Sequence, residues 1–252
     1  MNERRGDNDW PSLIRWYDVT LATPAENLAL DEVLLQEVDL NPTYGVLRTW
    51  EPAVHFVVVG RSNQIESEVH SVHCRRENVP ILRRSSGGGA VVVGPGCLAY
   101  ALMLPLTSHH RTQGVVGLTQ EIMEVIANGL CNTVPGVTVC GTSDLVIHNC
   151  KFSGNSQRWL KNAFLHHGTI LYEYELPRIE CWLKSPSLEP DYRSKRSHGD
   201  FLTNIGIRRE DLICELVAAW NGKLAELPAE TLNRTQVVAA QKYESDAWTF
   251  ER

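Results

Sequence analysis

The sequence predicts a soluble α/β protein with one catalytic domain, because apolar segments with strand-like and helix-like spacing alternate along the chain. The 252 residues, 43% of them hydrophobic and 21% charged, suffice for one sizeable core. We expect a flexible polar arm over residues 1–12 and the domain over residues 13–252. The arm lacks the apolar core of a signal peptide, and no run approaches the roughly 18 apolar residues of a membrane helix.

The net charge and the cysteine content argue against several classes of protein. The net charge of −6 argues against a general nucleic-acid surface. The seven cysteines are odd in number, scattered and without a Cys-x-x-Cys pair, which favours a reducing compartment over disulfides or structural zinc. His109 and His110 stand too isolated to indicate a metal site. We therefore expect a cytoplasmic protein with no metal-binding residues of its own.

The first half of the chain contains one strong helix signal. Thr23 to Glu26 forms a capping box with Pro24 at the first helical position, and the apolar spacing continues the helix until just before Asn41. A second helix is expected over residues 66–78, and residues 107–113 are expected to be a polar loop. The strands expected here share apolar, often β-branched residues and span residues 13–19, 46–50, 54–59, 79–82, 90–93 and 97–104.

The second half repeats the alternation. Apolar spacing predicts helices over residues 118–130, 209–220 and 228–241. Strands are expected over residues 137–140, 144–148 and 163–171, with a turn of small polar residues at 150–157. Residues 185–197 are loop-like and contain the basic run 193–196, which is usual for a solvated surface but could receive an acidic partner.

A glycine-rich segment indicates the functional site. Arg83 and Arg84 close an apolar strand, and Gly87, Gly88 and Gly89 follow before the next strand. Consecutive glycines cost backbone entropy, so they are expected where a ligand lies against bare backbone. Backbone N–H groups beside an arginine fork suit a phosphate or carboxylate, although a flexible hairpin with solvated arginines is the alternative.

Two common phosphate motifs do not fit this segment. A P-loop would need Gly-Lys-Ser or Gly-Lys-Thr to close it, and neither is present. Residues 94–99 match Gly-x-Gly-x-x-Ala, but the next segment is predicted to be a strand, so no helix opens at a dinucleotide site.

Two further segments could complete a pocket. Lys151 is followed by small polar residues that leave room for a ligand beside its ammonium group, so it is a candidate for stabilising charge on a phosphate or carbonyl. Most lysines in such turns are simply solvated. The polar turn at residues 60–64 is a second candidate wall, or a plain strand-to-helix connection.

Five motifs occur in order along the chain: Gly-Arg-Ser-Asn-Gln at 60–64, Arg-Arg-Ser-Ser-Gly-Gly-Gly-Ala-Val at 83–91, Ser-Asp-Leu-Val at 143–146, Lys-Phe-Ser-Gly-Asn at 151–155 and His-His-Gly-Thr at 166–169. Together they resemble the catalytic domain of lipoate–protein ligases, octanoyltransferases and biotin–protein ligases, and most of all the lipoate ligases. The resemblance implies an α/β (α+β) fold of the class II synthetase type, with a mixed, mostly antiparallel sheet flanked by helices.

The resemblance also implies an activity. ATP, with Mg²⁺ held mainly by its phosphates, and lipoate or octanoate would form an acyl-adenylate, and the acyl group would pass to a lysine of a lipoyl carrier domain. Lys151 would be catalytic, bridging the acyl carbonyl and the α-phosphate. The nucleotide and the acyl head would be held by Arg84, Ser86, Gly87, Gly88, Gly89, Ala90, Val91, Val92 and Lys151. The acyl-chain pocket would involve Arg61, Asn63, Ser153, Gly154, Asn155, His167, Gly168 and Thr169.

The chain departs from the ligases in two respects. Val93 and Gly94 stand where ligases have a His-Asp pair, and the Gly-Pro-Gly at 94–96 is similar to octanoyltransferases, which use a carrier thioester and no ATP. The small C-terminal accessory domain of longer ligases is not expected, which leaves room for a separate accessory subunit. The transferase alternative needs an acyl cysteine, for which Cys140 is the nearest candidate. A non-catalytic acyl-binding module is a third alternative.

Overall fold

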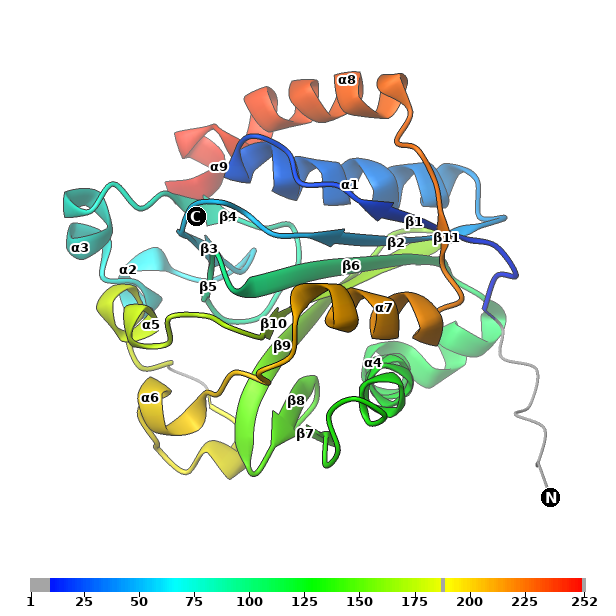
Figure 1. Cartoon of the computed structure of the whole chain (residues 1–252). Helices are drawn as coiled ribbons and strands as arrows, with labels where there is room; N and C mark the ends of the chain where they lie inside the picture. Colours follow the sequence, from blue (N-terminus) through cyan, green and yellow to red (C-terminus); the bar gives the residue numbers. More distant parts are fainter. Residues whose placement is uncertain (1–9, 187–188, 251–252) are drawn as a thin grey trace.

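The computed structural model describes residues 10–186 and 189–250, and within them the strands form a main sheet of eight strands and a small sheet of three (Figure 1). The main sheet runs in the order β11 (Lys223–Leu224), β1 (Ile14–Asp18), β2 (Gly45–Trp50), β6 (Cys97–Pro105), β10 (Ala163–Leu171), β9 (Cys150–Trp159), β8 (Asp144–Ile147) and β7 (Thr138–Cys140). Strand β1 pairs in parallel with β11 and β2, and the other pairings are antiparallel. The mixed, mostly antiparallel sheet is therefore confirmed.

The small sheet has the order β4 (Ile81–Arg83), β3 (Phe56–Val59) and β5 (Val91–Val93). Its central strand β3 is parallel to β4 and antiparallel to β5. The glycine-rich segment connects β4 to β5, so this sheet fixes both ends of the loop that the sequence singled out.

Helices cover both faces of the main sheet (Figure 1). Helix α1 (Pro24–Leu40) lies on one face with α8 (Ala229–Val238), while α4 (Ser108–Leu130) and α7 (Arg209–Ala219) cover the other. The shorter helical segments are α2 (Ile65–Glu68), α3 (Ser71–Arg76), α5 (Pro177–Trp182), η1 (Asp191–Arg193), α6 (His198–Phe201), η2 (Ala239–Tyr243) and α9 (Asp246–Phe250). Each face of the sheet therefore has its own apolar core.

The start of α1 follows the predicted capping box. The Thr23 hydroxyl accepts the Glu26 N–H at 3.1 Å, and the Glu26 carboxylate accepts the Thr23 N–H at 2.9 Å. A buried ion pair then fixes the helix to the sheet, because Arg48 on β2 donates to Asp31 on α1 over 2.6 Å. Arg48 also donates to the carbonyl oxygens of Val19 and Asn27, so its buried charge is fully engaged.

Three local predictions were wrong. Residues 66–78 do not form one helix, because Val69 adopts an extended backbone and bridges to Leu183, which separates α2 from α3. Residues 107–113 are not a loop, because Ser108 begins helix α4. Thr107 caps the N-terminus of this helix, and its hydroxyl accepts the His110 N–H at 3.2 Å. Gly114, with φ of 70°, kinks this helix.

The third wrong prediction concerns residues 150–157, which belong to strand β9 rather than to a turn. Both edges of β9 are paired, with β10 on one side and β8 on the other. Pairing on both sides compensates for the weak strand propensity of its small polar residues. Residues 1–9 of the expected N-terminal arm lie outside the described residues, and Trp10, the first described residue, stacks on His110 with ring centroids 4.7 Å apart.

Candidate active site

The glycine loop between β4 and β5 is organised around the Arg84 guanidinium, which lies under it. Arg84 is 7% exposed and donates to the carbonyl oxygens of Gly87 at 3.1 Å, Gly89 at 2.9 Å and Val58 at 3.3 Å. Gly88 has φ of 86°, a conformation that glycine adopts without strain. The loop carbonyls are thereby turned toward the arginine.

The backbone N–H groups of the three loop glycines have no comparable partners in the part of the chain that the structure describes. Among the described residues, none accepts a hydrogen bond from the backbone N–H of Gly87, Gly88 or Gly89. Three successive N–H groups around a residue of positive φ form a concavity that suits an anion. The next N–H, that of Ala90, is occupied by the carboxylate of Glu68 at 2.5 Å.

Neighbouring segments hold this loop in place. Arg61 N–H donates to the Ser86 carbonyl at 2.8 Å, and the Ser156 hydroxyl of β9 donates to the Gly87 carbonyl at 2.9 Å. The Ser86 hydroxyl lies 2.6 Å from Nε2 of His167 on β10. The loop therefore contacts the main sheet at two of its strands.

Burial shapes the titration of the charged groups around the loop. Burial lowers the pKa of Arg84 to about 10, against the opposing effect of the Glu68 carboxylate. Burial also lowers the pKa of His167 to about 3, aided by the charge of Arg84 and by His166. At neutral pH the loop therefore meets a cationic arginine and a neutral imidazole.

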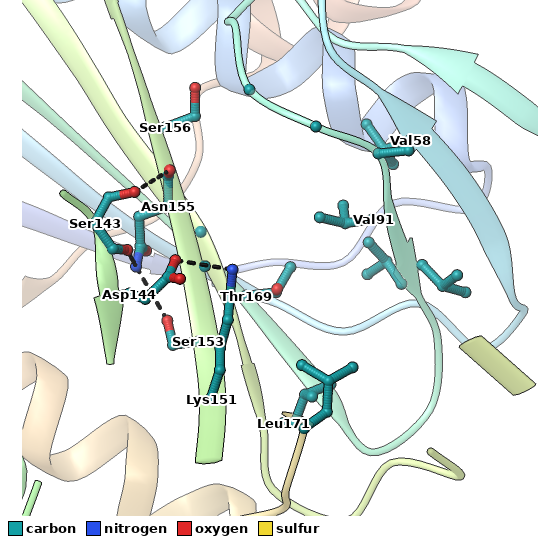
Figure 2. Close-up of a pocket in the computed structure, with 18 of the residues that line it drawn as sticks. Val58, Val91, Ser143, Asp144, Lys151, Ser153, Asn155, Ser156, Thr169 and Leu171 are labelled. Atoms are coloured by element: carbon teal, nitrogen blue, oxygen red, sulfur yellow. Dashed lines mark hydrogen bonds and ion pairs between the residues drawn. The ribbon is translucent and has the colours of Figure 1, made fainter. Parts of the chain in front are cut away.

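A cavity of about 500 Å³ lies between the small sheet and the main sheet, and Arg84 and Lys151 both line it (Figure 2). Its apolar wall comes from both sheets and from α1 and α5, and includes Leu28, Trp50, Val58, Val91, Val93, Ala99, Leu171 and Ile179. The polar side contains Lys151, the loop from Gly88 to Ala90, and polar residues of β9 and β10. Such a cavity can hold an apolar chain with an anionic head.

Lys151 lies at the start of β9, with its ammonium group directed into the cavity (Figure 2). Its Nζ pairs with Oδ1 of Asp144 on β8 at 2.8 Å, and its side chain is 26% exposed. A β-carbon at residue 154 would lie 2.7 Å from this Nζ, so Gly154 is the residue that leaves space for the lysine. The ammonium group is paired but remains accessible from the cavity.

Asn155 and Gly168 meet on neighbouring strands at the cavity wall. Asn155 Oδ1 accepts from the Tyr100 hydroxyl at 2.5 Å, and Asn155 Nδ2 donates to the Ser143 carbonyl at 2.8 Å. A β-carbon at Gly168 would come 1.7 Å from Asn155 Oδ1, so residue 168 has no room for a side chain. Ser153, Gly154, Asn155, His167, Gly168 and Thr169 all line the cavity, as do Gly88, Gly89, Ala90, Val91 and Val92.

Four of the predicted site residues are not among the lining residues, namely Arg61, Asn63, Ser86 and Gly87. Ser86 and Gly87 belong to the loop itself, and Arg61 and Asn63 belong to the turn that contacts it. The Asn63 amide donates to the Glu68 carboxylate, and Arg83 Nη1 donates to the Asn63 carbonyl at 2.7 Å. The turn at 60–64 therefore supports the loop from behind.

Sequence reasoning did not assign two carboxylates and the roof of the cavity. Glu68 and Asp144 are 8% exposed each and line the cavity. The roof segment, residues 184–186 and 189–202, contributes Lys184, Pro186, Glu189, Pro190, Arg193, His198, Phe201 and Leu202. The signals for Glu68 and the roof were an acidic residue within a predicted helix and a basic run within a predicted loop, neither of which is specific to a site. Asp144 belongs to the Ser-Asp-Leu-Val motif, which did not by itself assign it a role.

The described residues that line the cavity include no cysteine. Cys140 lies at the end of β7 and is not a lining residue. Cys97 is buried at the start of β6, and burial raises its pKa to about 12, so its thiol is protonated at neutral pH. Neither residue therefore provides a thiolate nucleophile next to the loop.

Within residues 10–186 and 189–250, no group of three or more His, Cys, Asp or Glu side chains is arranged to hold a metal ion. In the same part of the chain, no helix has the length and apolar character needed to cross a membrane.

A family model described as "Lipoyl protein ligase A/B catalytic domain" matches residues 23–211 of the chain. The chain belongs to this family. The matched span of the lipoyl protein ligase domain contains the glycine loop, Lys151 and the roof segment. The motif resemblance read from the sequence is thereby confirmed.

Individual relatives agree with the family match. Over 236 residues, the chain is 29% identical to a Mycoplasma genitalium protein named "Probable lipoate-protein ligase A", covering 90% of this chain and 69% of that protein. The fold is similar to a lipoate-protein ligase A crystallised with ATP, with a TM-score of 0.80 at 17% identity over 94% of this chain and 98% of that one.

A second solved structure belongs to an archaeal lipoylation system, described as a bi-partite lipoate protein ligase and its E2 lipoyl domain from Thermoplasma acidophilum. It has a TM-score of 0.79 at 17% identity and covers 95% of this chain and 96% of that one. At these identities the two structures establish that the lipoyl protein ligase fold extends over nearly the whole chain.

Proposed function

We propose that this protein is a lipoate–protein ligase, which activates lipoate or octanoate with ATP and transfers the acyl group to a lysine of a lipoyl carrier domain. The observation that supports it best is that Gly88 and Gly89, whose N–H groups have no acceptor among the described residues, line the same cavity as Lys151, together with an apolar wall. The first reaction brings a carboxylate and a phosphate together, and the repulsion between them has to be screened.

In the first step a carboxylate oxygen of the acyl substrate attacks the α-phosphorus of ATP. The bond between the α-phosphorus and the bridging oxygen breaks, and pyrophosphate leaves. The Lys151 ammonium would lie between the acyl carbonyl and the α-phosphate, and the N–H groups of Gly88 and Gly89 would bind phosphate oxygens. We expect Mg²⁺ to enter with ATP, held mainly by its phosphates.

In the second step the neutral amine of the acceptor lysine attacks the acyl carbonyl and forms an amide bond. AMP leaves with the electron pair of the mixed anhydride bond, and the proton lost by the amine passes to solvent. No thiol of the protein takes part in either step, which agrees with the absence of cysteine among the described lining residues. The aliphatic chain would lie against the valines of the small sheet and against Ala99 and Leu171.

The proposal includes a lipoyl domain as acceptor and allows for a separate accessory subunit. It also includes a cytoplasmic location.

Three reaction mixtures test this function, each read by intact mass of an apo lipoyl domain, with release of pyrophosphate measured as well in the mixture that contains ATP. The first contains lipoate and ATP, the second contains preformed lipoyl-adenylate, and the third contains octanoyl-carrier protein without nucleotide. We expect acylation in the first two. Acylation in the third alone would overturn the ligase assignment in favour of a transferase. Acylation in the second but not the first would remove adenylation from this chain and assign that step to another subunit.

A further inference from the structure

The pair of Lys151 and Asp144 has a third member, Tyr192. The Tyr192 hydroxyl donates to Oδ2 of Asp144 at 2.7 Å, while Oδ1 of the same carboxylate pairs with Lys151 Nζ at 2.8 Å. One carboxylate thus bridges a phenol and an ammonium group. Because each oxygen of the Asp144 carboxylate has its own partner, the carboxylate cannot rotate freely. Its fixed orientation also fixes the position of the Lys151 ammonium group.

Tyr192 does not belong to the strands that carry the other two residues. It lies in the roof segment, within the short helix η1, and its ring packs against Phe201, a lining residue, at 5.2 Å between centroids. The phenol therefore connects the covering of the cavity to the ion pair on its wall.

The roof and the residue that follows it, Thr203, also contact the backbone of the hairpin of β8 and β9. Arg196 Nη1 donates to the Asn149 carbonyl at 3.0 Å, and Thr203 N–H donates to the Lys151 carbonyl at 3.0 Å. These contacts hold the backbone of the hairpin. Tyr192 is the residue of the roof that reaches the side chain of Asp144.

The phenol is protonated and can only act as the donor toward Asp144. Burial, together with the charge of Asp144 and the hydrogen bond to it, raises the pKa of Tyr192 far above its ordinary value. The charged and titratable groups around it include Asp144, Cys140 and Arg196. At any pH where the protein would work, Tyr192 therefore supplies a fixed neutral donor.

We propose that Tyr192 is a positioning residue, which holds the Asp144 carboxylate so that Lys151 faces the reacting phosphate and carbonyl. This inference rests on the proposed function. It predicts that Tyr192 affects the rate of the chemical step more than the binding of the acyl substrate, since a misplaced catalytic group lowers kcat without removing binding contacts.

The test compares Tyr192→Phe with Tyr172→Phe. Tyr172 is a matched control because its hydroxyl also donates to a carboxylate, that of Glu51 at 2.9 Å, but Glu51, unlike Asp144, does not line the cavity. With lipoate and ATP as substrates, we expect Tyr192→Phe to lower kcat about 10-fold or more with KM for lipoate changed less than about 3-fold. Tyr172→Phe should keep the wild-type kcat.

A double-mutant cycle with Asp144→Asn separates positioning from packing. If Tyr192 acts through Asp144, the double variant should be no slower than Asp144→Asn alone. Additive losses, a wild-type kcat in Tyr192→Phe, or an equal loss in Tyr172→Phe would each overturn the proposal. Inactive wild-type protein in all three mixtures above would instead reject the ligase function, so the two failures are distinguishable.

Discussion

Gly60 and Gly88 are in direct backbone contact: a β-carbon on Gly60 would lie 1.9 Å from the carbonyl oxygen of Gly88. The two residues belong to separate turns, one after β3 and one after β4, and each turn is a connection of the small sheet. Because both partners in this contact are main chain, neither can yield by a change of rotamer. The position of the glycine loop is thus set by the turn behind it.

Gly60→Ala should therefore displace the loop. We expect a loss of about 1–3 kcal/mol in the free energy of unfolding, as for overpacking in a filled site, and weaker binding of ATP. Thermal melting and calorimetric titration with ATP measure the two effects. Gly199→Ala is the control, because a β-carbon there meets only atoms at 3.7 and 3.8 Å; equal behaviour of both variants would contradict the prediction.

Lys151→Ala should abolish modification of the lipoyl domain while leaving the fold intact. The ammonium group is the cationic side chain that the strand β9 presents to the cavity, and removal of one such charge costs about 100-fold or more in rate. Intact mass of the lipoyl domain over time gives the rate, and circular dichroism reports the fold. Lys223→Ala, on the exposed edge strand β11, should behave as the wild type. Retained modification in Lys151→Ala would remove this residue from its assigned role.

Cys140→Ala should leave lipoylation with ATP unchanged. The thiol does not line the cavity, and a substitution at a half-buried position away from a core network changes stability by less than about 1 kcal/mol. The measurement is the same time course of mass gain. A variant that loses activity but melts at the wild-type temperature would revive the cysteine-dependent transferase.

Stability should fall as the pH is lowered below the ordinary range of histidine. Burial lowers the pKa of His166 to about 3, so the folded protein keeps this imidazole neutral while the unfolded chain takes up a proton below about pH 6.5. The stabilisation is thus complete above that pH and is lost toward pH 3. One such group accounts for about 2 kcal/mol between pH 7.5 and pH 5.

Chemical unfolding of the wild type and of His166→Gln at these two pH values checks this dependence. The variant should lose less stability than the wild type over the same interval. An identical pH dependence in both proteins would show that His166 is not the group responsible. Burial also lowers the pKa of His167, so a His167→Gln variant allows the same comparison of stability at the two pH values.

Periodicity and capping predicted most of the fold. The helix after Thr23, the long strand at 97–104 and the helix over 118–130 follow from local sequence and are present in α1, β6 and α4. Strand β9 could not be predicted in this way, since Ser153, Gly154 and Asn155 are poor strand formers. Their extended conformation comes from hydrogen-bonded pairing with β8 and β10 on both edges of the strand, which the propensities of the single residues do not predict.

The site was predictable where its chemistry leaves a compositional mark. Three glycines after two arginines, and a lysine before small residues, indicated the loop and Lys151, and both contribute to one cavity. The contacts of Glu68 and Tyr192 were not visible, because a single acidic or aromatic residue has no distinctive neighbours in sequence. The Ser-Asp-Leu-Val motif contains Asp144 but does not indicate its pairing with Lys151. Their importance arises from the distances that the fold creates between them.

The Arg84 guanidinium beneath the glycine loop has a consequence for how such a loop evolves. A trans peptide unit that turns its oxygen toward a buried cation turns its N–H away from it, so Arg84 directs the N–H groups of Gly88 and Ala90 outward, and with that of Ala90 taken by Glu68 the N–H of Gly88 is left for a ligand. Selection for anion affinity can therefore operate on a side chain that the anion itself need not touch.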